Sequence, residues 1–365
     1  MAAEIELKLS LPEQALDALR AHPLLRACQL HEPRQRPLYN RYFDTPDQAL
    51  NRHAVALRIR RQEDEFIQTL KTRCSSQGGL HQRNEWEWQL PADRLDLSLI
   101  AAGSLPDAID PQQLRAAFST DFQRTTWLLE YSAAGAAARI ELVLDEGWVK
   151  AGEQRDPIRE VELELKGGAA AALIAFAREL AATLPLRICR ISKAERGYRL
   201  GCPERARQLP ALPPLPPTAS HPQPLYRLLA TLTERLQCAM EGFEFLRDPE
   251  LLLPLYDDLQ QLVLLLEAYA AHLPDSENAA ALPLATQLVS LSDQLRRLIA
   301  PLLVHRRWGG DGRLERHSAR LETELNAWLN SIALGQALLD LSSLLYHRPW
   351  QPDADPAEGF FHATP

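Results

Sequence analysis

Long apolar runs and targeting signals are missing from this sequence. The richest apolar stretch, Leu262 to Leu266, is stopped by Glu267, far short of the roughly 18 uncharged apolar residues that a membrane span needs. The first residues, Met1 to Glu6, contain neither the basic stretch nor the apolar stretch of a signal peptide. We therefore expect a cytoplasmic protein without a membrane partner.

Cysteine pairs and an excess of positive charge are missing as well. The cysteines, Cys28, Cys74, Cys189, Cys202 and Cys238, are scattered and odd in number, with no Cys-x-x-Cys motif. This argues against a disulfide framework and against a zinc site. The formal net charge of −8 argues against general nucleic-acid binding, because such proteins usually carry a basic balance. A local basic pocket remains compatible with this charge.

The chain of 365 residues is long enough for roughly two domains, and a proline-rich stretch suggests where they divide. Prolines recur through residues 203–224, and such a stretch continues neither a helix nor a central strand. We predict a first domain at 1–202, a linker at 203–224, a helical domain at 225–348 and a flexible tail at 349–365.

The two sides of this linker differ in their periodicity. Before it, apolar and charged residues alternate with a period of two, as in strands, whereas after it leucines recur at helical spacing. Many strands with few crossover helices indicate an antiparallel α+β domain, either an open sheet or a closed barrel, followed by a helical bundle. The predicted strands are 3–9, 38–43, 55–61, 65–72, 83–90, 124–131, 138–145, 148–150 and 158–166; the predicted helices are 12–20, 169–183, 225–247, 250–273, 284–305 and 314–345.

The strands of the first domain each carry charge on one face. Residues 4–8 read Glu-x-Glu-x-Lys, and residues 162–166 repeat the same spacing; side chains two apart on a strand share a face. These faces are either the solvated side of a sheet or the wall of a polar tunnel, in which buried charges must be paired or bound to metal. The charged residues concerned are Glu4, Glu6, Lys8, Arg58, Arg60, Lys71, Arg83, Glu85, Glu87, Arg124, Arg139, Glu141, Asp145, Glu160, Glu162, Glu164 and Lys166, with Lys193 before a final helical turn.

A tunnel of this kind would suit a condensed phosphate with divalent cations. Arginine gives bidentate contacts to phosphate and lysine gives a point charge, while Mg²⁺ takes carboxylate oxygens together with substrate phosphates. A closed barrel of about eight strands has room for one small ligand. The alternation alone leaves both orientations of the charged faces open.

A set of short motifs, in order, resembles a known family. Each motif is weak alone, but together they span about 200 residues and closely resemble the CYTH domain, also called the triphosphate tunnel metalloenzyme family, in its bacterial inorganic triphosphatase type with a C-terminal CHAD domain. The motifs are Glu4-x-Glu6-x-Lys8, Tyr42-Phe43-Asp44-Thr45-Pro46, Leu57-Arg58-Ile59-Arg60, Thr69-Leu70-Lys71, Gly79-Leu80-His81-Gln82-Arg83 with Glu85, Phe122-x-Arg124-x-x-Trp127, Asp145-Glu146-Gly147, Glu162-x-Glu164 and Ser192-Lys193-x-x-x-Gly197-Tyr198.

The resemblance implies an N-terminal eight-stranded antiparallel β-barrel, or tunnel, with flanking helices, and a C-terminal all-α bundle. It implies Mg²⁺ or Mn²⁺ as the cofactor, with two ions in the site. By position, the catalytic residues would be Glu4, Glu6 and Lys8. The phosphate-binding residues would be Lys8, Arg58, Arg60, Lys71, Arg124 and Lys193, and the metal ligands would be Glu4, Glu6, Glu85, Asp145, Glu162 and Glu164.

The implied activity is metal-dependent hydrolysis of inorganic triphosphate to diphosphate and phosphate. The sequence shows no Gly-x-x-x-x-Gly-Lys loop and no Ser-His-Asp pattern, so we expect neither P-loop chemistry nor a covalent intermediate. The alternatives are a thiamine or nucleoside triphosphatase or an adenylyl cyclase of the same fold, and a non-enzymatic polyphosphate-binding protein. The oligomeric state is left open.

The helical domain offers one basic concentration. It suits a polyanion such as polyphosphate, which CHAD domains are expected to bind, but it equally suits a solvated helical face with cations near a helix C-terminus. The domain is shorter than the resemblance implies, and a structural or dimerising role is an alternative. The residues are Arg296, Arg297, His305, Arg306, Arg307, Arg313, Arg316, His317 and Arg320.

Overall fold

The computed structural model describes residues 4–77, 80–100, 105, 109–133, 135–214, 222–270, 275–308 and 319–347. Within these ranges, side chains are described except for residues 4, 73–77, 80–84, 222–225, 269, 275–280, 305–308 and 319. The side chain of Glu4 and most of the basic concentration, including Arg313, Arg316 and His317, therefore lie outside the described part. So does the predicted tail at 349–365.

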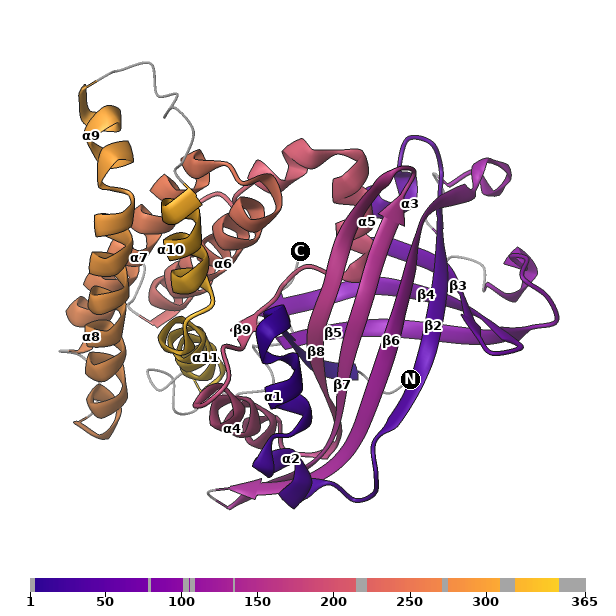
Figure 1. Cartoon of the computed structure of the whole chain (residues 1–365), viewed down its shortest axis with the longest axis horizontal. Helices are drawn as coiled ribbons and strands as arrows, with labels where there is room; N and C mark the ends of the chain where they lie inside the picture. The colour runs from indigo at the N-terminus through magenta and orange to yellow at the C-terminus, as the bar shows by residue number, and fades with distance from the viewer. Residues whose placement is uncertain are drawn as a thin grey trace.

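A nine-stranded antiparallel sheet forms the first part of the molecule (Figure 1). Its strands follow the order β5-β4-β3-β2-β6-β7-β8-β1-β9, and β1 also pairs with β5 from Glu4 to Leu7. The strands are β1 (Glu4–Ser10), β2 (Arg34–Asp44), β3 (Val55–Gln62), β4 (Glu65–Gln77), β5 (Leu80–Leu90), β6 (Arg115–Ala133), β7 (Ala136–Ala151), β8 (Gln154–Gly168) and β9 (Arg187–Ile188).

The predicted eight-stranded barrel is thus correct only as a large antiparallel sheet, because the strand count is nine. The short β9 pairs with β1 next to Leu9 and Ser10, and a two-residue strand leaves no alternation to detect. The predicted strands 138–145 and 148–150 are one continuous strand, β7. Gly147 does not break it, because the strand stays in register with Phe122 on β6.

Apolar side chains cover the outside of the sheet. Leu57, Ile59 and Leu70 pack with Leu50 and the half-buried Trp86 in one cluster, as the alternation of β3 and β4 requires. The opposite faces of the same strands carry the charged residues. A second and larger cluster extends from the sheet through α4 (Ala170–Ala181) into the C-terminal helices. The apolar core therefore lies on the outer side of the sheet.

Short helices connect the strands, and sequence periodicity detects few of them. The predicted helix at 12–20 is a 3₁₀ turn followed by one short helix, and α2 and α3 are too short to show an amphipathic repeat. The predicted helix at 169–183 is α4. These elements are η1 (Glu13–Ala15), α1 (Leu16–Arg20), α2 (Pro23–Cys28), α3 (Ala49–Arg52), η2 (Leu97–Leu99), η3 (Pro111–Gln113), α5 (Lys193–Gly201) and η4 (Pro203–Arg207).

The C-terminal part, called the helical region below, is built from helices that gather beside the sheet, with α4, β9 and α11 at the junction (Figure 1). Its core is leucine-rich, including Leu236, Leu259, Leu288, Leu295 and Leu341. Among the described residues, no helix combines the length and apolar character required to cross a membrane. The elements are α6 (Pro222–Leu246), η5 (Pro249–Leu251), α7 (Leu252–Ala270), α8 (Asp275–Leu298), α9 (Ala300–Trp308), α10 (Ala319–Leu329) and α11 (Ile332–His347).

Two of the helices predicted here are each divided in two. The predicted helix at 284–305 is α8 followed by α9, and the one at 314–345 is α10 followed by α11. Pro301 lies in the first turn of α9, where proline is favoured because its missing N–H is not needed. In the second case Ser331 begins the new helix, since its hydroxyl accepts a hydrogen bond from the Leu334 amide at 3.2 Å.

Candidate active site

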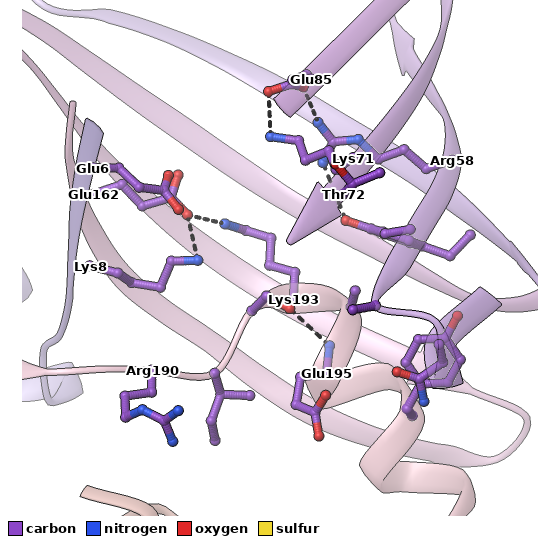
Figure 2. Close-up of a pocket in the computed structure, with 18 of the residues that line it drawn as sticks. Glu6, Lys8, Arg58, Lys71, Thr72, Glu85, Glu162, Arg190, Lys193 and Glu195 are labelled. Atoms are coloured by element: carbon purple, nitrogen blue, oxygen red, sulfur yellow. Dashed lines mark hydrogen bonds and ion pairs between the residues drawn. The ribbon is translucent and has the colours of Figure 1, made fainter. Parts of the chain in front are cut away.

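A cavity of about 1200 Å³ lies on the charged side of the sheet. The charged faces line it, so the structure decides in favour of the inward orientation that the alternation left open. Figure 2 shows these side chains entering the cavity from several strands and from α5. The predicted site residues that line it are Glu6, Lys8, Arg58, Arg60, Lys71, Glu85, Arg124, Glu162, Glu164 and Lys193.

Glu162 is the centre of one charged group. Lys8, directly opposite it on β1, places its Nζ 3.1 Å from Glu162 Oε1. Lys193 donates to the same oxygen at 3.2 Å, and Arg124 donates to Glu162 Oε2 at 3.1 Å. Figure 2 shows the two lysines approaching Glu162 from different elements. Three predicted phosphate-binding cations thus meet at one predicted metal ligand.

Two fully buried carboxylates lie behind this group. Asp145 and Glu160 face each other across β7 and β8, and both are 0% exposed. Arg124 donates to both oxygens of Asp145, at 2.7 and 2.6 Å, and Lys193 contacts Asp145 at 2.7 Å and also bonds Glu160. Within the described residues, Asp145, Glu160 and Glu162 offer oxygens that lie within 4.8 Å of one another, which is close enough to share one cation.

These acidic and basic groups keep one another ionised, because opposite charges lie close together. Burial works to raise the pKa of Glu162, but the charges of Lys193, Lys8 and Arg124 outweigh it and hold that pKa well below its ordinary value. Burial works to lower the pKa of Lys193, but Asp145, Glu160 and Glu162 raise it above its ordinary value. Both groups are therefore ionised at neutral pH.

A row of carboxylates lies along the cavity wall next to Glu162. Glu164 pairs in register with Glu6 on β1 and with Glu141 on β7, and all three line the cavity. Directly opposite residues bring their Cβ atoms to about 5 Å. Burial raises the pKa of Glu164; Lys166, at 2.6 Å, opposes this, and the neighbouring Glu141 and Glu6 raise the pKa further. The row is a place where a divalent cation would relieve like-charge repulsion.

A second basic group lies on β3 and β4. Lys71 contacts Glu85 at 2.6 Å, and Arg58 lies 3.7 Å from the same carboxylate. Figure 2 shows this trio on a different wall of the cavity from Glu162. The charge of Arg58, together with burial, lowers the pKa of Arg60 to about 10. Crowding of two guanidiniums on one strand is the electrostatic condition in which an anion binds favourably.

Two glycines of the motifs allow close packing around the site. A Cβ on Gly147 would lie 2.2 Å from the Asp121 carbonyl oxygen of β6, and one on Gly197 would lie 2.2 Å from the ring of Phe118. Both contacts are far shorter than side-chain carbons allow. Gly197 therefore lets α5, which carries Lys193, lie directly on the sheet.

Asp44 of the Tyr-Phe-Asp-Thr-Pro motif acts as a structural junction. One of its oxygens accepts from the Thr45 and Leu50 amides at 2.7 and 2.8 Å. The other accepts from the Asn51 amide at 3.1 Å and from the Tyr198 hydroxyl at 2.7 Å. Because Tyr198 belongs to α5, the motif ties the helix that carries Lys193 to the end of β2.

Two carboxylates of this site, Glu160 and Glu141, have no role in the motifs of the sequence. Glu160 and Glu141 lie on the charged faces that the alternation identified, two residues before Glu162 and four before Asp145. Their place on a charged strand face is the sequence feature that points to them. Only the register of β7 with β8 shows which residues lie next to Glu141 and Glu160. Asp145, by contrast, is buried behind Arg124 and Lys193 rather than at the cavity wall.

The chain is similar to a curated protein and to solved structures. It is 35% identical over 202 residues to the inorganic triphosphatase of Haemophilus influenzae; the aligned part spans 55% of this chain and about half, 56%, of that protein. A Hippeastrum protein described as having a dominant triphosphatase activity matches 52% of this chain and 93% of its own at 18% identity, with a TM-score of 0.36. A candidate adenylate cyclase of Bacillus halodurans matches 49% and 90% at 23% identity, with a TM-score of 0.28.

At TM-scores this low, the two structural alignments carry no inference about function. The family comparison is more direct, because the CYTH domain model matches residues 2–198, more than half of the chain, and includes every motif from Glu4 to Tyr198. It ends before the helical region, whose assignment as a CHAD domain stays a prediction. The chain belongs to the CYTH domain family.

Proposed function

We propose that this protein hydrolyses inorganic triphosphate to diphosphate and phosphate in the charged cavity, with the help of a divalent metal ion. The observation that carries the proposal is the convergence of Lys8, Arg124 and Lys193 on Glu162, with the Arg58–Lys71 group on another wall of the same cavity. The likeness to a protein named inorganic triphosphatase supports it.

The proposal includes a tunnel that closes around the substrate. Pairing of β1 with β5, between Glu4–Leu7 and Leu80–Arg83, supports closure of the first eight strands, with β9 added beside β1. In such a tunnel the basic groups on different walls would contact a phosphate chain from several directions. Lys8, Arg58, Arg60, Lys71, Arg124 and Lys193 are the residues we propose to bind it.

The carboxylates fit a hard divalent cation, because oxygen ligands are those that Mg²⁺ and Mn²⁺ prefer. Glu162 and the row formed by Glu6, Glu141 and Glu164 face the cavity, and we propose that they hold the metal. Glu4, Glu85 and Asp145 remain further proposed ligands. A bound ion of this type would offset the negative charge of the phosphates and lower the pKa of an attacking water.

The chain's own residues would act by position and charge. Lys193 and Arg124 stay protonated because neighbouring carboxylates raise their pKa values, so they stabilise negative charge on phosphate oxygens without donating a proton. Glu162 stays ionised and serves as an acceptor for cations. Lys8 lies where it could hold either the terminal phosphate or the nucleophile.

A second candidate is hydrolysis of an organic triphosphate. The cavity, at about 1200 Å³, exceeds the roughly 300–1,000 Å³ of pockets that hold drug-sized ligands. It therefore has room for a nucleoside or thiamine attached to the triphosphate. Hydrolysis of such a substrate, or adenylyl cyclisation of ATP, would need this room. Polyphosphate binding by the helical region and a cytoplasmic location also remain proposals.

The test is phosphate release from inorganic triphosphate, ATP and thiamine triphosphate, with Mg²⁺ or Mn²⁺, by the full chain and by Glu162→Gln. We expect rapid release from inorganic triphosphate and a loss of about 100-fold or more in kcat in the variant, because a bound metal ion contributes several kcal/mol of transition-state stabilisation. Faster release from an organic triphosphate would favour the second candidate. A folded, metal-supplied protein that releases neither phosphate nor diphosphate from any of them would refute the enzymatic proposal in favour of polyphosphate binding.

A further inference from the structure

One face of α6 brings the helical region to the cavity wall. Glu234, Cys238 and Glu241 follow one another at spacings of four and three residues, so they share one face of the helix. All three line the same cavity as the charged strands. No role for these residues follows from the triphosphate motifs, which end at Tyr198.

Arg190 is the contact of this face with the sheet region. Its backbone N–H donates to Glu241 Oε1 at 2.6 Å. Its guanidinium donates to Cys238 Sγ at 2.8 Å and to Glu234 Oε1 at 2.5 Å. The backbone and the side chain of Arg190 are thus held by three residues that share one face of α6. Figure 2 shows Arg190 at the lower edge of the site, on the segment that leads up to Lys193.

The same segment is held on its other side by the strand that carries Lys8. The Cys189 amide donates to the Lys8 carbonyl at 2.9 Å, and Ile188 pairs with Leu9. Arg187, which is buried, forms an ion pair with Glu244 of α6. Residues 187–193 therefore run from β9, which pairs with β1, to α5, with α6 along one side. They lie between Lys8 and Lys193, the two lysines that meet at Glu162.

The distance along the chain from the anchor to the site is short. Lys193 follows Arg190 by three residues, with Ile191 and Ser192 between them. The Ser192 hydroxyl accepts from the Glu195 amide at 3.1 Å and so begins α5. We expect a stretch this short, without glycine and ending in a helix cap, to pass a displacement of Arg190 on to the backbone of Lys193.

We propose that Arg190 and Glu241 are positioning residues of the triphosphate site, through which α6 fixes residues 187–193 and thereby sets the place of the Lys193 ammonium beside Glu162. This inference rests on the proposed function, because it assigns to the helical region a part in the same site. Neither residue needs to touch the substrate. A displacement of about 1 Å at a binding group is enough to cost large factors in rate.

The first test compares Glu241→Ala with Glu241→Gln in the full chain. Alanine removes the acceptor of the Arg190 N–H, whereas glutamine keeps an amide oxygen as an acceptor. We expect Glu241→Ala to lower kcat/KM for inorganic triphosphate about ten- to hundredfold. The loss should appear mainly as a higher KM, because Lys193 is proposed to bind phosphate in the ground state and the transition state alike. Glu241→Gln should recover most of the loss.

A matched control is available at the same junction. Arg178 of α4 forms an ion pair with Asp340 of α11 at 2.7 Å, and neither residue lies in the segment 187–193. Arg178→Met should leave KM unchanged. If Glu241→Ala does not fold, Arg190→Lys serves in its place, since it keeps the charge and loses the planar fork that reaches Glu234 and Cys238.

Amide hydrogen exchange separates this inference from the proposed function. Exchange of the Cys189 amide and its neighbours should be faster in Glu241→Ala than in wild type, and unchanged in Arg178→Met. If the wild-type protein releases no phosphate, the proposed function is refuted. The hydrogen-exchange comparison alone would then test whether Glu241 holds residues 187–193 in place. Wild type with release, but with KM and exchange unaltered in Glu241→Ala and Arg190→Lys, would overturn the inference. Equal losses in Glu241→Ala and Glu241→Gln would overturn it too.

Discussion

The sheet and the helical region use their interiors in opposite ways. Inside the sheet, Lys8 is 2% exposed, and Asp145 and Glu160 are fully buried, although buried charges are costly even when paired. The described core of the helical region is built instead from leucines such as Leu259, Leu288 and Leu341. Buried charges that reduce stability indicate a functional site, whereas leucine packing indicates a supporting role.

The two regions meet along one face of α6, where the helical region carries polar and charged side chains. α6 presents carboxylates and a thiol to the cavity, on a helix whose other face packs through Leu229, Leu232 and Leu236. The sheet region presents Arg190 to them, and Arg187 to Glu244 on the same helix. This junction is where a change in the helical region should be felt at the site.

The largest loss of stability and activity is expected when one charge of the buried group is removed. Lys193→Met leaves Asp145, Glu160 and Glu162 without the cation that they share, and loss of one partner from a buried ion pair costs about 3–5 kcal/mol of unfolding free energy. Triphosphate hydrolysis should also fall below detection in the folded fraction. Urea unfolding and phosphate release measure the two effects.

Lys150→Met is the matched control, on the strand β7 that also carries Asp145. Lys150 pairs with Asp121 at 3.1 Å on the exposed side, and such pairs contribute at most about 1 kcal/mol. Equal loss of stability in the two lysine variants would contradict the account of a costly buried charge group.

Packing in the helical region should affect stability and leave the site alone. Leu288→Ala removes a buried side chain of α8, and such truncations lower the unfolding free energy by about 2–5 kcal/mol. At a temperature where the variant is folded, KM for triphosphate should match wild type. A raised KM without loss of stability would mean that the two regions are coupled throughout and not mainly at α6.

A contact beneath α5 should affect both properties moderately. In Gly197→Ala the new Cβ would lie 2.2 Å from the ring of Phe118, so α5 must move outward with Lys193, at a cost of about 1–3 kcal/mol. KM should rise together with the loss in melting temperature. Gly201→Ala is the control in the same helix, because a Cβ there meets no atom of the described residues within 4 Å. A comparable loss in that variant would rule out the contact with Phe118 as the cause.

The smallest expected effect is a pKa shift at the junction. Burial raises the pKa of the Cys238 thiol to about 11; Arg190 lowers it, while Glu241 and Glu234 raise it. Glu234→Gln removes a negative charge that disfavours the thiolate, so the pKa should fall. The pH dependence of alkylation, followed peptide by peptide, measures it, with Cys28 as an internal reference because its pKa is raised by burial and Glu179. An unchanged or higher value for Cys238 would contradict the arrangement around Arg190.

Part of the site could be read from the sequence because alternation is a local property. The segment Leu57-Arg58-Ile59-Arg60 places both arginines on one face whatever the rest of the chain does, and both line the cavity. Other parts could not be read in this way. The short α3 and β9 carry too few residues for a periodic signal, and Gly147 resembles a turn until Phe122 is seen beside it.

Local patterns in the chain specify which residues share a strand face and which helices are amphipathic, and its motifs indicate the CYTH family. The folded molecule shows that the charged faces turn inward, which the alternation alone leaves open, that Lys8 and Arg124 meet at Glu162, and that α6 holds Arg190. Side-chain alternation depends on one strand, whereas inward or outward orientation depends on where the apolar faces find partners. Neighbours across the sheet depend on the register of strands far apart in the chain, and no local pattern contains that register.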